Sequence, residues 1–154
     1  MQLAGFLDCD AIKTALPGGN KRSLMKQLAD LAGQRLGIKP TVVLAGLYER
    51  EQLGSTGFGQ GVAIPHAKIE GLEQVYALFV RLGDPVDYKA IDGRPVDLVF
   101  LLLSPPDAGA EHLKALAAIS RVTRDVATLE RLRGARSRDA LAAVLMGADE
   151  RDAA

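Results

Sequence analysis

Apolar residues in the first third of the chain recur every three to four positions, which is the spacing of one face of an α-helix. The longest such pattern runs from Asn20 to Leu36. Asn20 carries a side-chain oxygen that can cap the first turn, and Gly37 can end the helix in a left-handed conformation. A second amphipathic helix is predicted over residues 40–50, because Pro40 suits a helix start. The predicted buried face of the first helix consists of Leu24, Leu28, Leu31 and Ala32.

The pattern changes to that of β-strands in the middle of the chain. Residues 75–82 and 96–103 are rich in large and β-branched apolar side chains. The second run is apolar nearly throughout, which indicates a central strand covered on both faces. Shorter strands are predicted over residues 12–16 and 62–68. Residues 53–61 form a glycine-rich loop before the latter strand.

Helical spacing returns after the second long strand, over residues 108–124. Asp125 and Ser137 can each cap a further helix, the last ending at Gly147. Residues 149–154 are predicted to be a disordered tail. Strands between two helical regions predict a single three-layer α/β or α+β domain over residues 1–148 rather than a regular Rossmann repeat. The side chains of the 108–124 helix that are predicted to face inward are Leu113, Leu116, Ala117 and Ser120.

Composition removes several classes of function. Nineteen basic and nineteen acidic residues cancel, so no nucleic-acid partner is expected. The longest apolar run, residues 98–103, is too short for membrane insertion, and the first residues do not resemble a signal peptide. Cys9 is the only cysteine, so neither an internal disulfide nor a cysteine-rich zinc site is expected. We therefore expect a cytoplasmic protein.

His66 is the strongest candidate for a reacting residue. Only two histidines occur, His66 and His112, and a lone histidine is more often structural than catalytic. His66, however, directly follows Pro65, which fixes its own φ and biases Ile64 toward an extended conformation. It also follows closely on the glycine-rich loop, so we expect it to lie in a functional site.

The loop itself is a candidate phosphate-binding element. Glycines at positions 54, 57, 59 and 61 permit unusual backbone angles and close approach to a ligand. Their amides can form a concavity for an anion, to which Ser55 and Thr56 would add hydroxyl donors. Ser55, Thr56 and Gly57 are therefore the predicted phosphate contacts. The alternative is that the loop is simply a mobile turn.

Other site chemistries fit less well. The loop has neither the Gly-x-Gly-x-x-Gly spacing nor the Lys-Ser/Thr of a nucleotide cradle. His66 and His112 lie on separate segments without metal-ligand spacing, and no nucleophile elbow occurs. No metal and no cofactor are expected. Arg50, just before the loop, either compensates a helix C-terminus or binds an anion through its planar guanidinium.

Residues 50–68 read REQLGSTGFGQGVAIPHAK, and residues 90–100 read AIDGRPVDLVF. These segments, with Ser104-Pro105 and Glu111-His112-Leu113, resemble enzyme IIA proteins of the bacterial phosphotransferase system, in the mannitol/fructose/nitrogen class. The resemblance covers essentially the whole chain and is strongest to the nitrogen-regulatory enzyme IIA. Gln60 and Ala67 are small departures from the pattern of that type.

The resemblance implies a fold and a set of roles. The fold would be the mannitol/fructose-type enzyme IIA fold, a central mixed β-sheet flanked by helices on both faces. His66 would accept the phosphoryl group, through Nε2, with His112 beside it and Arg50 lining the same pocket. We also expect an apolar rim of Phe58, Val62 and Ile64 that docks partners and shields the phosphohistidine from water.

The expected function is that of a regulatory, transferase-like phosphocarrier. It would receive phosphate from an HPr-type phosphoprotein and control regulatory target proteins according to its phosphorylation state. One alternative is a stand-alone fructose- or mannitol-type IIA that passes phosphate to a IIB component, since no permease segment follows Ala154. A second alternative is a binding module whose His66 is never phosphorylated.

Overall fold

The computed structural model describes residues 1–153 and contains a six-stranded sheet. Its centre is an antiparallel pair, β5 (Tyr76–Val86) and β6 (Val96–Ser104). Strand β1 (Lys13–Leu16) pairs in parallel with β5 at one edge. On the other side of β6 lie two short strands, first β3 (Val62–Ala63) and then β2 (Gly57–Gly59) at the edge. The predicted long strands and the short first strand are confirmed, although β5 extends four residues beyond its predicted end at Leu82.

The predicted strand at residues 62–68 is divided in two. Strands β3 (Val62–Ala63) and β4 (His66–Lys68) both pair in parallel with β6, and Ile64 and Pro65 separate them. Part of the glycine-rich loop is also a strand, β2 (Gly57–Gly59), which pairs antiparallel with β3. The sheet is therefore mixed, as expected.

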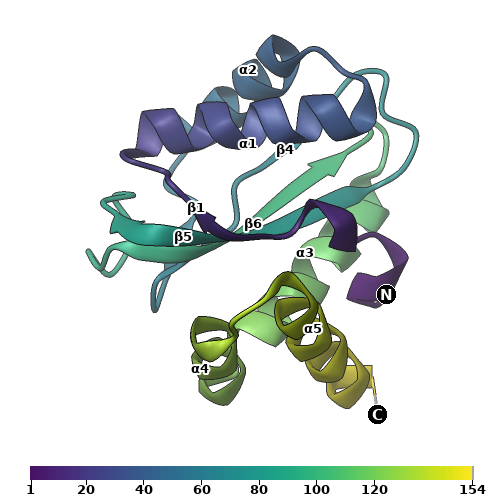
Figure 1. Ribbon diagram of the computed structural model, residues 1–154. Helices are drawn as coiled ribbons and strands as arrows, with labels where there is room; N and C mark the ends of the chain where they lie inside the picture. Colours follow the sequence, from purple (N-terminus) through teal and green to yellow (C-terminus); the bar gives the residue numbers. More distant parts are fainter. Residues whose placement is uncertain (154) are drawn as a thin grey trace.

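Helices cover both faces of this sheet (Figure 1). On one face lie α1 (Lys21–Leu36) and α2 (Pro40–Glu51). On the other lie α3 (Gly109–Thr123), α4 (Val126–Gly134) and α5 (Arg138–Ala153). Each face buries its own hydrophobic cluster against the sheet, which confirms the predicted three-layer domain.

The first helix forms as its sequence predicts. The Asn20 side chain accepts a hydrogen bond from the Ser23 amide at 2.8 Å, and Gly37 ends the helix with φ +69°. Three of the four predicted core residues are fully buried, and Leu31 packs at the edge of the same cluster. The predicted cap Asp125 is confirmed, and the Ser137 side chain likewise accepts a hydrogen bond from the Ala140 amide.

The inward face of α3 differs from the prediction. Leu113 is 65% exposed and Ala117 is exposed, while Leu116 and Ser120 are only half-buried. The helix instead presents His112, Ala115, Ala118, Ile119 and Val122 to the interior. The helix is therefore rotated relative to the prediction. In this orientation His112 reaches Ser104 on β6, and the small alanines allow close packing on the sheet.

Helix α5 continues to Ala153, whereas the sequence predicted its end at Gly147 and a disordered tail over residues 149–154. Asp149 is buried, and its carboxylate accepts hydrogen bonds from the amides of Leu3 at 2.8 Å and Ala4 at 3.3 Å. These amides open a 3-10 turn and have no partner within it, so an acidic side chain satisfies them. Residues 149–153 are thus helical, and Ala154 lies outside the described residues.

Candidate functional site

His66 opens β4 and lies beside the carboxyl end of β6. Its register partner there is Leu102, whose amide donates to the carbonyl of Pro65 at 3.0 Å. Proline has no amide hydrogen and interrupts regular pairing, which explains why the chain kinks between β3 and β4. The His66 side chain is thereby held at the end of the sheet and is 7% exposed.

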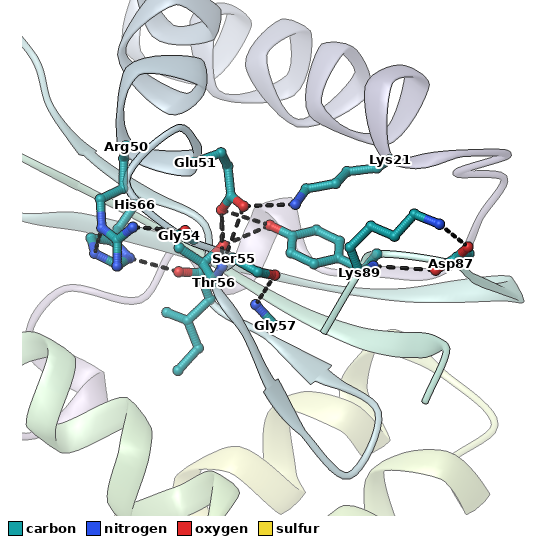
Figure 2. A network of polar contacts seen from close by, with 12 residues as sticks. Lys21, Arg50, Glu51, Gly54, Ser55, Thr56, Gly57, His66, Asp87 and Lys89 are labelled. Atoms are coloured by element: carbon teal, nitrogen blue, oxygen red, sulfur yellow. Dashed lines mark hydrogen bonds and ion pairs between the residues drawn. The ribbon is translucent and has the colours of Figure 1, made fainter. Parts of the chain in front are cut away.

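The hydrogen bonds of the His66 ring define its tautomer. Nδ1 lies 2.7 Å from the carbonyl oxygen of Ile64. Because a carbonyl can only accept, Nδ1 carries the proton and Nε2 keeps its lone pair. Nε of Arg50 donates to that Nε2 at 3.1 Å (Figure 2). The ring therefore offers Nε2, and not Nδ1, as a nucleophile.

Arg50 is fixed by a second contact as well. Its Nη1 donates to the carbonyl oxygen of Gly54 at 2.9 Å. The guanidinium thus bridges the end of α2, the start of the glycine-rich loop and the imidazole of His66 (Figure 2). A cation at this helix end also compensates the helix dipole, while the binding of an anion by Arg50 stays a prediction.

His112 approaches from the opposite layer. It lies in the first turn of α3, and its ring centroid is 5.5 Å from that of His66 with the rings tilted by 49°. Its Nδ1 lies 2.6 Å from Oγ of Ser104. The structure therefore brings together Arg50, His66 and His112 from three different elements, as the resemblance implies.

The three residues line one cavity of about 350 Å³. Basic side chains of Arg50 and Lys68 and the acidic side chain of Glu49 stand around it. A group the size of a phosphoryl fits easily within this volume, and the two cations favour an anion. The remaining lining residues are Gly46, Leu53 and Ala67.

The surroundings of both histidines favour the neutral ring. Burial lowers the pKa of His66, and the charge of Arg50 lowers it further, while the backbone hydrogen bond to Ile64 and the charge of Glu51 act in the other direction. Burial also lowers the pKa of His112, to which His66 and Lys68 contribute. A neutral imidazole is the form that can attack phosphorus.

The predicted phosphate contacts Ser55, Thr56 and Gly57 do not line this cavity. The Thr56 amide lies 3.3 Å from both carboxylate oxygens of Glu51, and the Thr56 hydroxyl also bonds to Glu51 (Figure 2). The Gly57 amide donates to the hydroxyl of Ser55 at 3.1 Å. The loop does bind an anion, but that anion is the protein's own carboxylate. The donors of Thr56 and Gly57 are therefore not free for a phosphate in this arrangement.

Glu51 is the residue that the sequence reasoning missed. Its carboxylate also pairs with Lys21 at 2.8 Å and accepts from the hydroxyl of Tyr88 at 3.2 Å. Its position in the sequence could have indicated this role, because Glu51 lies at the end of a helix, directly before a loop rich in hydrogen-bond donors. Gly57 is required there for packing, since a Cβ would lie 2.7 Å from that of Ala90.

The expected apolar rim is also different. Val62 and Ile64 are 2% and 1% exposed and belong to the core under α3 and α5. Phe58 on β2 is 48% exposed, as expected of a rim residue, but it does not line the cavity. The apolar side chain that is both exposed and part of the cavity wall is Leu53, at 83%.

Residues 1–153 contain no group of three or more His, Cys, Asp or Glu side chains arranged to hold a metal ion. Within the described part of the chain, no helix is long and apolar enough to cross a membrane.

Comparisons with known proteins identify the family of the chain. The family model described as phosphoenolpyruvate-dependent sugar phosphotransferase system, EIIA 2, matches residues 5–147. The nitrogen regulatory protein of Bradyrhizobium diazoefficiens is 44% identical over 145 residues, covering 94% of this chain and 95% of that protein. That of Pseudomonas aeruginosa is 40% identical over 127 residues, 82% of each. The crystal structure of the nitrogen regulatory protein IIA-Ntr from Neisseria meningitidis superposes with a TM-score of 0.87 at 34% identity, covering 93% of this chain and 98% of that one. The chain belongs to the type 2 EIIA family of the phosphotransferase system, and its similarity extends to the nitrogen regulatory proteins of that family.

Proposed function

We propose that this protein is a regulatory phosphocarrier of the nitrogen type. It accepts a phosphoryl group on Nε2 of His66 from an HPr-type phosphoprotein, and its phosphorylation state controls its binding to regulatory target proteins. The observation that carries the proposal is the single unprotonated ring nitrogen of His66, aimed at Arg50 within a cavity that His112 also lines.

The transfer step needs no proton from solvent. The lone pair of Nε2 forms the new N–P bond while the N–P bond of the donor phosphohistidine breaks, and its electron pair stays on the donor nitrogen. Nδ1 keeps its proton and its hydrogen bond to the carbonyl of Ile64. Phosphoryl transfer depends mainly on positioning and on stabilisation of charge at the phosphoryl oxygens, which Arg50 is placed to supply.

Arg50 must change partners in this step. Once Nε2 is bonded to phosphorus it no longer accepts a hydrogen bond, so the Nε donor of Arg50 passes to a phosphoryl oxygen. The contact from Nη1 to the Gly54 carbonyl keeps the guanidinium close to the site meanwhile. In the unphosphorylated protein the same arginine occupies the nucleophile's lone pair and orients the ring.

The regulatory role is supported by the relatives, which are nitrogen regulatory proteins at 44% and 40% identity. The surface that would read the phosphorylation state is the cavity mouth, where Leu53 is exposed one residue before Gly54, the residue that anchors Arg50. A partner that covers this mouth contacts the phosphoryl group, the arginine and an apolar side chain together.

The decisive experiment is incubation with a phosphorylated HPr-type donor. The expected product is one acid-labile, base-stable phosphate per chain, with the ³¹P resonance of an Nε2-phosphohistidine. A wild-type protein that gains no phosphate contradicts the phosphocarrier function and leaves only the binding-module reading. Phosphate retained in His66→Ala excludes His66 as the acceptor.

Variants of the supporting residues test their roles. Arg50→Ala is expected to slow transfer about a hundredfold, the usual cost of removing one donor to a transition-state oxyanion. Arg22→Ala, an exposed arginine on α1, is the matched control and should transfer at the wild-type rate. Equal rates in the two variants would reduce Arg50 to a structural role.

Capture of partners decides the pathway. Phosphorylated and unphosphorylated protein are immobilised in parallel, and the retained proteins are identified. Regulatory proteins bound in one state only support the nitrogen-type function. Transfer of the phosphate to a sugar-specific IIB component would instead assign the chain to sugar uptake.

A further inference from the structure

Ser104 is a buried polar residue in direct contact with His112. It ends β6, its side chain is fully buried, and its Oγ lies 2.6 Å from Nδ1 of His112. His112 lies on α3, so this contact joins the central strand of the sheet to the helix that carries the second histidine. The distance is that of a strong hydrogen bond.

The direction of this hydrogen bond follows from counting protons. A serine hydroxyl has one proton to donate, while an unprotonated Nδ1 can only accept. Among residues 1–153 the structure gives the Ser104 hydroxyl no other hydrogen-bond partner. If Nδ1 of His112 donated the proton, the hydroxyl hydrogen of Ser104 would be buried without an acceptor, which native structures avoid.

We propose that Ser104 is a positioning residue whose hydroxyl donates to Nδ1 of His112 and so holds that imidazole in the tautomer with the proton on Nε2. The two ring nitrogens occupy different edges of the imidazole, and the ring lines the cavity. Nε2 is therefore on the edge that Ser104 does not contact.

The two histidines then hold opposite tautomers. His66 carries its proton on Nδ1 because the Ile64 carbonyl accepts there, and it presents a lone pair. His112 carries its proton on Nε2 and presents a donor. Resting on the proposed function, this pairing supplies a neutral N–H that hydrogen-bonds an oxygen of the phosphoryl group once His66 carries it.

The surrounding charges favour neutral rings and hence defined tautomers. Burial lowers the pKa of His112, and His66 and Lys68 lower it further. The charged groups around the cavity are Arg50 and Lys68, which oppose a positive ring, and Glu49, which is exposed to solvent. The Glu111–Lys114 pair on α3 is exposed as well and internally compensated.

The tautomers are measurable without any phosphate donor, by long-range ¹H–¹⁵N correlation of the histidine side chains at neutral pH. The expected wild-type spectrum has one histidine, His66, protonated on Nδ1 and the other, His112, protonated on Nε2. In Ser104→Ala the signals of His112 should move toward a mixture of tautomers, while those of His66 stay in place and report an intact fold. Ser120→Ala, on the same helix as His112, is the matched control and should leave both patterns unchanged.

Two results would overturn the inference: a wild-type His112 protonated on Nδ1, or an Nε2 proton on His112 that persists unchanged in Ser104→Ala. Neither depends on phosphorylation, so both are distinct from failure of the proposed function. The wild-type measurement also stands if the alanine variant does not fold.

Phosphoryl transfer supplies the functional readout. Loss of one oriented hydrogen bond predicts a rate of transfer to His66, or a phosphohistidine lifetime, reduced about 3- to 10-fold in Ser104→Ala, with Ser120→Ala unaffected. If wild type is phosphorylated and Ser104→Ala matches it in both quantities, Ser104 has no part in transfer. If wild type itself gains no phosphate, the proposed function fails while the tautomer result stands.

Discussion

Arg50 and Glu51, neighbours at the end of α2, position different parts of the site. Successive side chains on a helix point about 100° apart, so Arg50 and Glu51 face different surroundings. Arg50 reaches His66, and Glu51 reaches the loop that follows the helix (Figure 2). The loop holds Glu51, and Glu51 in turn fixes the helix end that carries Arg50. The order of the loop and the placement of the arginine are therefore coupled through adjacent backbone.

Glu51→Gln tests this coupling. The glutamine keeps the shape but loses the charge that pairs with Lys21 and replaces one acceptor oxygen with an amide donor. Because the side chain is 8% exposed, we expect the free energy of unfolding to fall by about 2 kcal/mol, measured by urea denaturation. Glu49→Gln, exposed on the same helix, should change it by less than about 0.5 kcal/mol. Equal effects would mean that the Glu51 contacts contribute little.

The two histidines predict a dependence of stability on pH. Folding lowers the pKa of His66 and of His112 below the ordinary value of 6.5. The unfolded chain therefore binds more protons once the pH falls below that value, and stability that is present above it is lost on acidification through the folded pKa. The urea midpoint should drop between about pH 7.5 and 5.5 and stay constant from about pH 7.5 to 8.5.

His112→Gln separates the histidine contribution from other titrations. A smaller drop of the midpoint over the same acid interval is expected in this variant, because one of the two titrating rings is gone. A midpoint that rises on acidification would place the acid sensitivity on other groups, and a drop of the same size in the variant would mean that His112 does not contribute to it.

At the scale of elements, the sequence predicted those helix limits that depend on interactions between residues close together in the chain. The helix from Asn20 to Gly37 has its own cap, apolar face and stop, so its limits follow from the sequence. The rotation of α3 could not be predicted in this way. Leu113 and His112 are adjacent in sequence, and only the position of β6 decides which of them faces inward. Here the contact with Ser104 and the close packing of Ala115 outweigh burial of a leucine.

The candidate site shows the same division. His66 could be singled out because Pro65 and the glycines are its neighbours in sequence. The sequence did not predict the contacts that Thr56 makes here, because its partners, Glu51 and Tyr88, lie five and thirty-two residues away. Donors in a loop predict that an anion is bound, but they do not say whether the anion is a ligand or a side chain of the protein.

Gly57→Ala tests the packing of β2, the strand formed by part of the glycine-rich loop. A Cβ at this position would lie 2.7 Å from the Cβ and 2.8 Å from the Cα of Ala90, so β2 must move away from that turn. We expect a loss of about 1–3 kcal/mol in the free energy of unfolding, as for other overpacked sites. Gly134→Ala is the control, because nothing lies within 4 Å of its Cβ position. A tolerated Gly57→Ala would show that the loop adapts freely.

At the scale of the whole molecule, the site exists because two layers meet at one end of the sheet. Arg50 comes from α2 on one face, His112 from α3 on the other, and His66 from the strand between them (Figure 1). The distance between the rings of His66 and His112 therefore depends on how both helical layers pack against the sheet. Contacts far from the cavity that fix the α3–α5 layer contribute to its geometry.

Asp149 is such a contact, because it ties α5 to the amino terminus. Its carboxylate accepts from the amides of Leu3 and Ala4, and the 3-10 turn Leu3–Gly5 packs against α3 and α5. Asp149→Ala leaves the buried amide of Leu3 without its acceptor, so we expect the free energy of unfolding to fall by about 1–3 kcal/mol and amide exchange at Leu3 to accelerate. Glu150→Ala, the exposed neighbour on the same helix, should be neutral in both measurements.

If the two variants behaved alike, residues 149–153 would add no stability and the domain would effectively end at residue 148. If only Asp149→Ala loses stability, the final turns of α5 are part of the domain that positions His112.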